Sequence, residues 1–206
     1  GGKNLICLCS NGLTSKNLLT CISKNINDCK TAALVVTADN EYKENNYHVH
    51  RCIKELESLD LIVDVFDLDK QPAELLLTYD VTEFIGGNPF YLLHAIKKHN
   101  AINVLREIAD NKVLIGWSAA AFVFSPSLEL VNVYSPELNF IGLTDLKALA
   151  LTKVEILPHY SRFINRFEFF EEKCCAYEEE HNAEVFRLND GDGVFIDGEE
   201  ILVCRA

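Results

Sequence analysis

The sequence predicts an α/β fold with a mostly parallel β-sheet that helices cover on both faces. Strand-like apolar runs alternate with segments of helical spacing along most of the 206 residues, as in repeated βα units. The run 31–38 (TAALVVTA) is apolar almost throughout, which is typical of a parallel strand buried on both faces. Near the end, Asp197-Gly198 separates two apolar runs and predicts a β-hairpin. The length predicts one domain over residues 1–206.

Local spacing indicates each element in turn. Leu18, Ile22 and Ile26 share one helical face, while Asn88 and Pro89 suit the cap and first position of a later helix. The expected helices are 15–26, 46–59, 73–77, one opened by Asn88-Pro89, 101–110, a short helix that Pro126 ends, and 163–181. The expected strands are 4–9, 31–38, 61–68, 81–85, the run before Gly116, 128–134, 155–157, 193–196 and 201–204.

The last expected helix carries a single apolar stripe on an acidic segment. We interpret this stripe as core packing. It consists of Phe163, Phe167, Phe170, Cys174 and Tyr177.

Composition excludes several classes of protein. A net charge of −12 argues against a nucleic-acid surface, because phosphate binding needs clustered Lys and Arg. No apolar run approaches the roughly 20 residues needed to span a bilayer, so we expect no membrane segment. The eight cysteines form no C-x-x-C pair, and a reduced cytoplasm is the simplest setting for them. We expect no metal and no organic cofactor, since no Cys/His cluster has ligand spacing and Gly86-Gly87 is too short for a dinucleotide fingerprint.

The segment 112–121 has the outline of a nucleophile elbow. An apolar run ends at Gly116, Trp117 and Ser118 follow, and small helix-forming residues come next. A serine raised at the start of a helix gains a partial positive field and a nearby backbone N–H for an oxyanion. Read alone, a Gly-x-Ser before alanines is more often an ordinary turn than an elbow.

Two further features belong at the same edge of the predicted sheet. Gly86-Gly87 ends a strand before a helix, and its unobstructed N–H groups suit an oxyanion, although a plain tight turn would look the same. His159 follows a proline at the end of another apolar segment and is the best candidate base among the six histidines. Because ligand sites form at the carboxyl ends of parallel strands, these residues are expected to converge with Ser118.

Three segments together resemble the peptidase E (aspartyl dipeptidase) and cyanophycinase family of serine peptidases. They are 85–93 (IGGNPFYLL), 116–121 (GWSAAA) and 158–160 (PHY), in the order and spacing of that family. The resemblance implies a three-layer, flavodoxin-like fold related to class I glutamine amidotransferases. It implies hydrolysis of small peptides, with acidic N-terminal dipeptides as candidate substrates. It also implies Ser118 as nucleophile, His159 as general base, and an oxyanion site at the backbone of Gly87 and Ala119, with Gly86 and Asn88 beside it.

The sequence departs from the family pattern near this site. Ala120 replaces the final glycine of the elbow, and Pro89 stands where a threonine is common. The acid expected some fifteen residues beyond the serine has only Glu137, slightly late, or Glu129, slightly early, as candidates. We take Glu137 as the predicted orienting acid. These departures keep open an alternative, a catalytically degenerate member that binds a peptide or small anion.

Substrate recognition is predicted only by charge. Arg162 and Arg166 follow His159, and Arg162 is the candidate for binding an acidic group of the substrate. Pairing of these arginines with nearby glutamates is the plainer interpretation. The expected partner is a small peptide substrate, and neither the oligomeric state nor the exact substrate follows from the sequence.

Overall fold

The computed structural model describes residues 3–206. The predicted α/β fold with a mostly parallel sheet is confirmed. Seven strands lie in the order β3-β2-β4-β5-β1-β8-β9, and the first five of these are parallel to one another. The strands of the central sheet are β1 (Leu5–Cys9), β2 (Thr31–Val35), β3 (Ile62–Phe66), β4 (Val81–Phe84), β5 (Val113–Trp117), β8 (Gly193–Asp197) and β9 (Glu200–Cys204).

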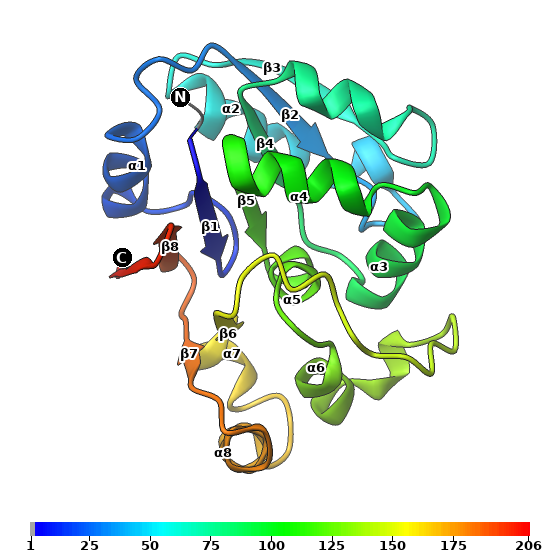
Figure 1. The fold of residues 1–206 in the computed structure, drawn as a ribbon. Helices are drawn as coiled ribbons and strands as arrows, with labels where there is room; N and C mark the ends of the chain where they lie inside the picture. Colours follow the sequence, from blue (N-terminus) through cyan, green and yellow to red (C-terminus); the bar gives the residue numbers. More distant parts are fainter. Residues whose placement is uncertain (1–2) are drawn as a thin grey trace.

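Helices cover the sheet on both faces and complete three layers (Figure 1). Alternate residues of each strand point to opposite faces, so each face has its own apolar core. Leu5, Cys7 and Cys9 pack with α1 and α2, whereas Ile6 and Leu8 pack with α3, α4 and α5. The helices are α1 (Lys16–Ser23), α2 (Val49–Glu57), α3 (Pro89–Lys98), α4 (Ile102–Asn111), α5 (Ala119–Phe124), α6 (Glu129–Tyr134), α7 (Tyr160–Phe163) and α8 (Phe170–His181), with 3-10 turns η1 (Lys43–Asn45), η2 (Ala73–Thr78) and η3 (Pro136–Leu138).

A second, two-stranded sheet lies beyond the carboxyl ends of the central strands. It pairs β6 (Glu155–Leu157) in parallel with β7 (Val185–Arg187). Figure 1 shows these strands and helices α6 to α8 grouped below β1 and β5. The strand at 155–157 matches its prediction, whereas β7 has no counterpart in the sequence analysis. Among residues 3–206, no helix has the length and apolar content to cross a bilayer.

Two expected elements differ from the prediction. The strand expected over 128–134 is wrong, because this segment forms α6. Its buried residues Leu130, Val131 and Tyr134 follow helical spacing, while Val133 is 47% exposed. The long helix expected over 163–181 begins only at Phe170, as α8, because Phe169 before it has a left-handed backbone with φ of 52°. The first residue of the expected range, Phe163, instead ends the short helix α7.

The predicted C-terminal hairpin is present with its turn displaced by one residue. Asp197 pairs with Glu200, so Gly198 and Glu199 form the loop between β8 and β9. Gly198 adopts φ of +60°, which suits a residue without a side chain. The hairpin extends the sheet beyond β1, since β8 runs antiparallel to that strand.

Candidate active site

Ser118 lies in a strained turn between β5 and α5. Its φ of 54° and ψ of −113° are unusual for a residue with a side chain, as expected for a nucleophile elbow. Gly116 makes the turn compact, because a Cβ there would lie 2.3 Å from the Phe124 ring and 3.2 Å from the Ala120 methyl. Ala120 therefore fits in this elbow, with its methyl buried against the space left by Gly116.

His159 reaches Ser118 from the end of β6. The distance between His159 Nε2 and Ser118 Oγ is 2.9 Å, within hydrogen-bond range. The histidine has a left-handed backbone with φ of 59°, and its own N–H donates to Ser10 Oγ at 2.8 Å. Ser10 directly follows β1, the neighbour of β5, so the register of the sheet fixes it close to Ser118.

Asp190 contacts the other nitrogen of the histidine ring. Its Oδ1 lies 2.7 Å from His159 Nδ1 and accepts a bond from Ser10 Oγ at 2.8 Å, while Oδ2 accepts from Arg162 Nε at 2.7 Å. Glu137, the acid predicted for this place, is not the residue found there. Its carboxylate instead accepts a hydrogen bond from the Ser135 hydroxyl.

Burial of the histidine favours its neutral form. Burial lowers the pKa of His159; Asp190 opposes this effect, and the Arg162 and Arg166 charges add to it. Burial alone would raise the pKa of Asp190, but hydrogen bonds from His159, Arg162 and Ser10 outweigh burial and keep that pKa below its usual range. We assign the ring proton to Nδ1, facing the ionised carboxylate, which leaves Nε2 free to accept the Ser118 hydroxyl proton.

Arg162 lies beside the histidine and Asp190 and does not line the cavity next to Ser118. Besides its bond to Asp190, its Nη2 lies 2.7 Å from His159 Nδ1, and its side chain is 56% exposed. Arg162 thus pairs with an aspartate and not with a helix glutamate, the partner that the plainer interpretation had expected. Arg166, the other arginine considered, lines the cavity next to Ser118, whereas Arg162 does not.

The glycine pair lies across from Ser118 at the end of β4. Gly86 allows close packing, since a Cβ there would lie 2.7 Å from the Trp117 ring. Gly87 has φ of +148°, and a Cβ would lie 2.5 Å from the Ala38 carbonyl. Within residues 3–206, neither the Gly87 N–H nor the Ala119 N–H is hydrogen-bonded, and both residues line the pocket beside Ser118. These two donors are therefore available for an oxyanion.

Asn88 has a structural place at this edge. Its side-chain oxygen accepts from the N–H groups of Phe90 and Tyr91 at 2.9 and 3.1 Å, which caps α3. Its amide nitrogen donates to the Leu138 carbonyl at 2.8 Å, and its own N–H donates to the Ala38 carbonyl at 2.9 Å. Asn88 thus joins the glycine turn to the loops on either side of it.

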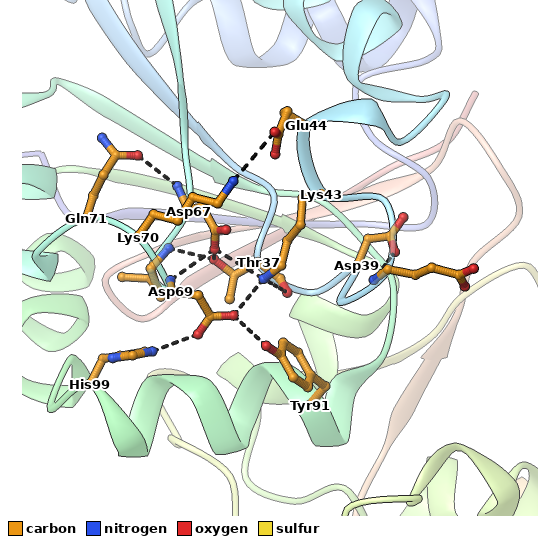
Figure 2. A network of polar contacts seen from close by, with 12 residues as sticks. Thr37, Asp39, Lys43, Glu44, Asp67, Asp69, Lys70, Gln71, Tyr91 and His99 are labelled. Carbon is orange, nitrogen blue, oxygen red and sulfur yellow. Dashed lines mark hydrogen bonds and ion pairs between the residues drawn. The ribbon is translucent and has the colours of Figure 1, made fainter.

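A polar network braces the loop that packs on Gly87 (Figure 2). Lys43 Nζ lies 2.6 Å from Asp69 and 3.3 Å from Asp67, and Asp69 also accepts bonds from Tyr91 and His99. Tyr91 lies in α3 and His99 follows its last residue, so the network ties the loops after β2 and β3 to that helix. The network thereby holds in place the loop after β2, whose Ala38 carbonyl packs against Gly87.

A cavity of about 150 Å³ opens next to Ser118. Gly87 and Ala119 lie at its edge, aromatic and aliphatic side chains form its walls, and two charged residues, Glu137 and Arg166, also line it. Phe163 and Phe167 of the predicted core stripe line this cavity, whereas Phe170, Cys174 and Tyr177 are buried as expected. In the part of the chain that the structure describes, no group of three or more His, Cys, Asp or Glu could hold a metal ion.

Comparison with known proteins identifies the family. A family model described as Peptidase family S51 matches residues 6–204. The chain belongs to peptidase family S51. It is 30% identical over 181 residues to an uncharacterized peptidase of Listeria monocytogenes serovar 1/2a, covering 85% of this chain and 86% of that protein. Peptidase E of a Shewanella species is 30% identical over 109 residues, covering 52% of this chain and 44% of the Shewanella protein.

Solved structures agree with this S51 assignment. A peptidase E-like protein from Listeria monocytogenes superposes with a TM-score of 0.78 at 26% identity, covering 99% of both chains. A peptidase from an acI-B1 Actinobacterium superposes with a TM-score of 0.70 at 14% identity, covering 99% of this chain and 91% of the other. The second similarity shows the shared fold alone.

Two residues of this S51 site were missed by sequence reasoning. Asp190 lies in an acidic stretch before the C-terminal hairpin to which the sequence analysis assigned no role, and Ser10 is a single serine after a strand. For Ser10 the available signal was positional, because it follows β1 at the edge where ligand sites form. Asp190 had no such signal, because β7, the strand before it, was not predicted.

Proposed function

We propose that this S51 peptidase hydrolyses small peptides with Ser118 as nucleophile, His159 as general base and Asp190 as the acid that orients the histidine. One observation carries the proposal: Ser118 Oγ lies 2.9 Å from His159 Nε2, while Asp190 lies 2.7 Å from Nδ1 of the same ring. This is the arrangement of an activated serine, with a base in reach and a third group that fixes the tautomer.

The proposed reaction proceeds in two halves. The Ser118 oxygen attacks the peptide carbonyl while His159 Nε2 takes its proton, and the oxyanion forms against the N–H groups of Gly87 and Ala119. His159 then returns the proton to the leaving amine, which departs and leaves an ester on Ser118. A water molecule, deprotonated by His159, hydrolyses this ester and restores the serine. Asp190 stabilises the imidazolium during both halves.

Reaction with a fluorophosphonate tests the proposal, since this reagent bonds covalently to activated serines. We expect the wild-type protein to gain one phosphonyl group by mass spectrometry, and Ser118→Ala to gain none. Ser161→Ala is the matched control, because Ser161 is exposed two residues after His159, and it should be labelled like the wild type. An unlabelled wild-type protein would refute the proposal and favour the alternative, a member that only binds a peptide or small anion.

The state of the cysteines indicates the cellular compartment. All eight cysteines are free thiols, including Cys21 and Cys204, whose sulfurs lie 3.1 Å apart. Free thiols in contact are most easily maintained in a reducing environment, so we propose that the protein works in the cytoplasm.

A further inference from the structure

The cavity beside Ser118 has walls that are mainly apolar. Phe122, Val131 and Tyr134 are buried there, with exposed fractions of 6%, 3% and 8%. Phe163 and Phe167 complete the wall, and the Phe163 ring packs against the His159 ring with the two centroids 4.9 Å apart. An apolar substrate group would therefore meet carbon on most sides.

The size of the cavity matches one side chain. Its volume of about 150 Å³ is that of a protein cavity known to accept benzene. The cavity is thus large enough for one phenyl ring or one leucine side chain, and too small for two residues of a peptide. Because Ser118 and the oxyanion donors of Gly87 and Ala119 lie at its edge, the side chain nearest the attacked carbonyl is the one that can enter.

The charges at the cavity offset each other. The Arg166 guanidinium lies over the rings of Phe163 and Phe167, at 5.4 and 5.1 Å from their centroids. Glu137 lines the same cavity, and a hydrogen bond from Ser135 together with the Arg166 charge lowers its pKa, so it is ionised at neutral pH. A pocket that selects an acidic side chain needs an excess of positive charge, whereas here one carboxylate stands against one guanidinium.

We infer that this cavity is a specificity pocket for a large apolar side chain, of phenylalanine or leucine size, on the residue whose carbonyl Ser118 attacks. The inference rests on the proposed function and narrows its substrate class. It departs from the acidic dipeptides that the family resemblance implies, because the walls are aromatic and Glu137 offsets Arg166.

Boronic acids test the pocket directly, since their boron forms a reversible bond with an activated serine. Methylboronic acid and 2-phenylethylboronic acid would compete with fluorophosphonate labelling of the wild-type protein. We expect the phenylethyl compound to compete at a concentration at least tenfold lower, as its ring enters the cavity. Equal potency of the two compounds would overturn the inference while leaving the serine chemistry intact. Failure of fluorophosphonate labelling itself would instead refute the proposed function.

Variants in α6 show whether the cavity is responsible. Val131→Phe fills it and should abolish the preference for the phenylethyl compound while methylboronic acid still competes. Val133→Phe is the matched control, because Val133 lies two residues away and is 47% exposed outside the cavity. If Val131→Phe fails to fold, Phe167→Ala opens the wall from a partly exposed position and should also reduce the preference about tenfold. A preference unchanged in a folded variant would refute the assignment.

Substrate hydrolysis tests the role of charge. Among aminoacyl p-nitroanilides, we expect kcat/KM for Phe and Leu to exceed that for Ala and Asp by about tenfold or more. Glu137→Gln leaves Arg166 unopposed, so it should raise kcat/KM for the Asp substrate relative to the Phe substrate. Faster cleavage of the Asp substrate by the wild type, or an unchanged ratio in Glu137→Gln, would contradict the inference.

Discussion

Replacing Asp190 by asparagine should disable the serine without displacing it. The acid contacts His159, Ser10 and Arg162 at 2.7 to 2.8 Å, and asparagine has nearly the same shape. The substitution removes the negative charge that stabilises the imidazolium and allows the wrong ring tautomer. In serine proteases with this arrangement, the same change lowers kcat by about 10⁴. We therefore expect Asp190→Asn to lose about 10³ to 10⁴ in the rate of phosphonylation.

Arg162 allows a sharper form of this test. Its Nη2 lies 2.7 Å from His159 Nδ1, so without the Asp190 charge the guanidinium repels the developing imidazolium. Two charges about 4 Å apart interact by about 4 kcal/mol at an effective dielectric constant of 20. Because Arg162 is 56% exposed, solvent screening reduces this to about 1 kcal/mol. The double variant Asp190→Asn/Arg162→Ala should therefore react about fivefold faster than Asp190→Asn.

The assay is the second-order rate constant for fluorophosphonate labelling at pH 8, which requires no knowledge of the substrate. Arg162→Ala alone should lose less than tenfold, since Asp190 still holds the ring. Asp110→Asn, an exposed acid of α4, serves as the control and should match the wild type. A loss below tenfold in Asp190→Asn, or a double variant slower than Asp190→Asn, would refute the assignment of Asp190 and the electrostatic reasoning.

Three further predictions concern pH and stability, and a fourth concerns the glycine turn. Since burial keeps the pKa of His159 below 6.5, the acid limb of the labelling rate should have its midpoint below pH 6.5 in a pH–rate profile, and a midpoint above 7 would contradict the environment described. Burial, with the nearby Glu55 charge, raises the pKa of Glu83 to about 8, so the folded state holds a proton that the unfolded state loses at lower pH. The free energy of unfolding should therefore fall by a few kcal/mol as the pH rises from about 5 to 8. Urea titrations of Glu83→Gln should show a weaker decline, and an equal decline would argue against this carboxyl as its source. Hydrogen bonds from Lys43, Tyr91 and His99 outweigh burial and lower the pKa of Asp69 to about 2. The stability that ionised Asp69 contributes is therefore present above about pH 4 and lost as the pH falls through 2. Asp69→Asn should lower the free energy of unfolding by about 1–2 kcal/mol at pH 7 in the same titration, and no loss would mean that the network is not stabilising. Gly87→Ala places a Cβ 2.5 Å from a backbone carbonyl at a φ of +148°, so it should lower the melting temperature and the labelling rate together, and wild-type values of both would contradict the close packing.

The parts of the site that local patterns predict are those at the ends of adjacent elements. Ser118 and Gly87 each follow a buried strand and precede a helix, and the pairing of β4 with β5 brings these two turns together. Such a juxtaposition follows from the general geometry of parallel sheets, where ligand sites form at the carboxyl ends. His159 was expected at the same edge for the same reason, and its ring lies there.

Asp190 could not be predicted in this way because a nonlocal pairing positions it. The Leu188 N–H donates to the Leu157 carbonyl at 2.9 Å, and the Tyr160 N–H donates to the Leu188 carbonyl at 2.9 Å. These bonds continue the β6–β7 pairing past the strand ends and bring Asp190 beside His159. Nothing in the separate patterns at 155–157 and 185–187 indicates that they pair, so an acid nearer the serine in sequence was the natural choice.

The prediction of a strand over 128–134, where α6 lies, failed for a different reason. In 128–134, apolar residues fit both an alternating and a helical pattern, and valines favour a strand. Tertiary packing decides between them, because the helix buries Leu130, Val131 and Tyr134 together, and Tyr134 lies 4.9 Å from the Phe170 ring centroid. A strand would have placed Val131 on the side opposite to Leu130 and Tyr134, so the three residues could not be buried together.

The position of α6 separates the residues proposed for catalysis from those proposed to select the substrate side chain. Ser118, His159 and Asp190 depend on strand ends and on the β6–β7 pairing, and none of them is held by α6. The cavity wall, by contrast, is formed largely by α6 and by the segment between α7 and α8, which lie outside the central sheet. Substitutions in this wall can change the preferred side chain while leaving the hydrogen bonds of the serine and histidine in place. Substrate preference should therefore be inferred from the residues of the wall in this chain, since the matching motifs around the serine carry no information about it.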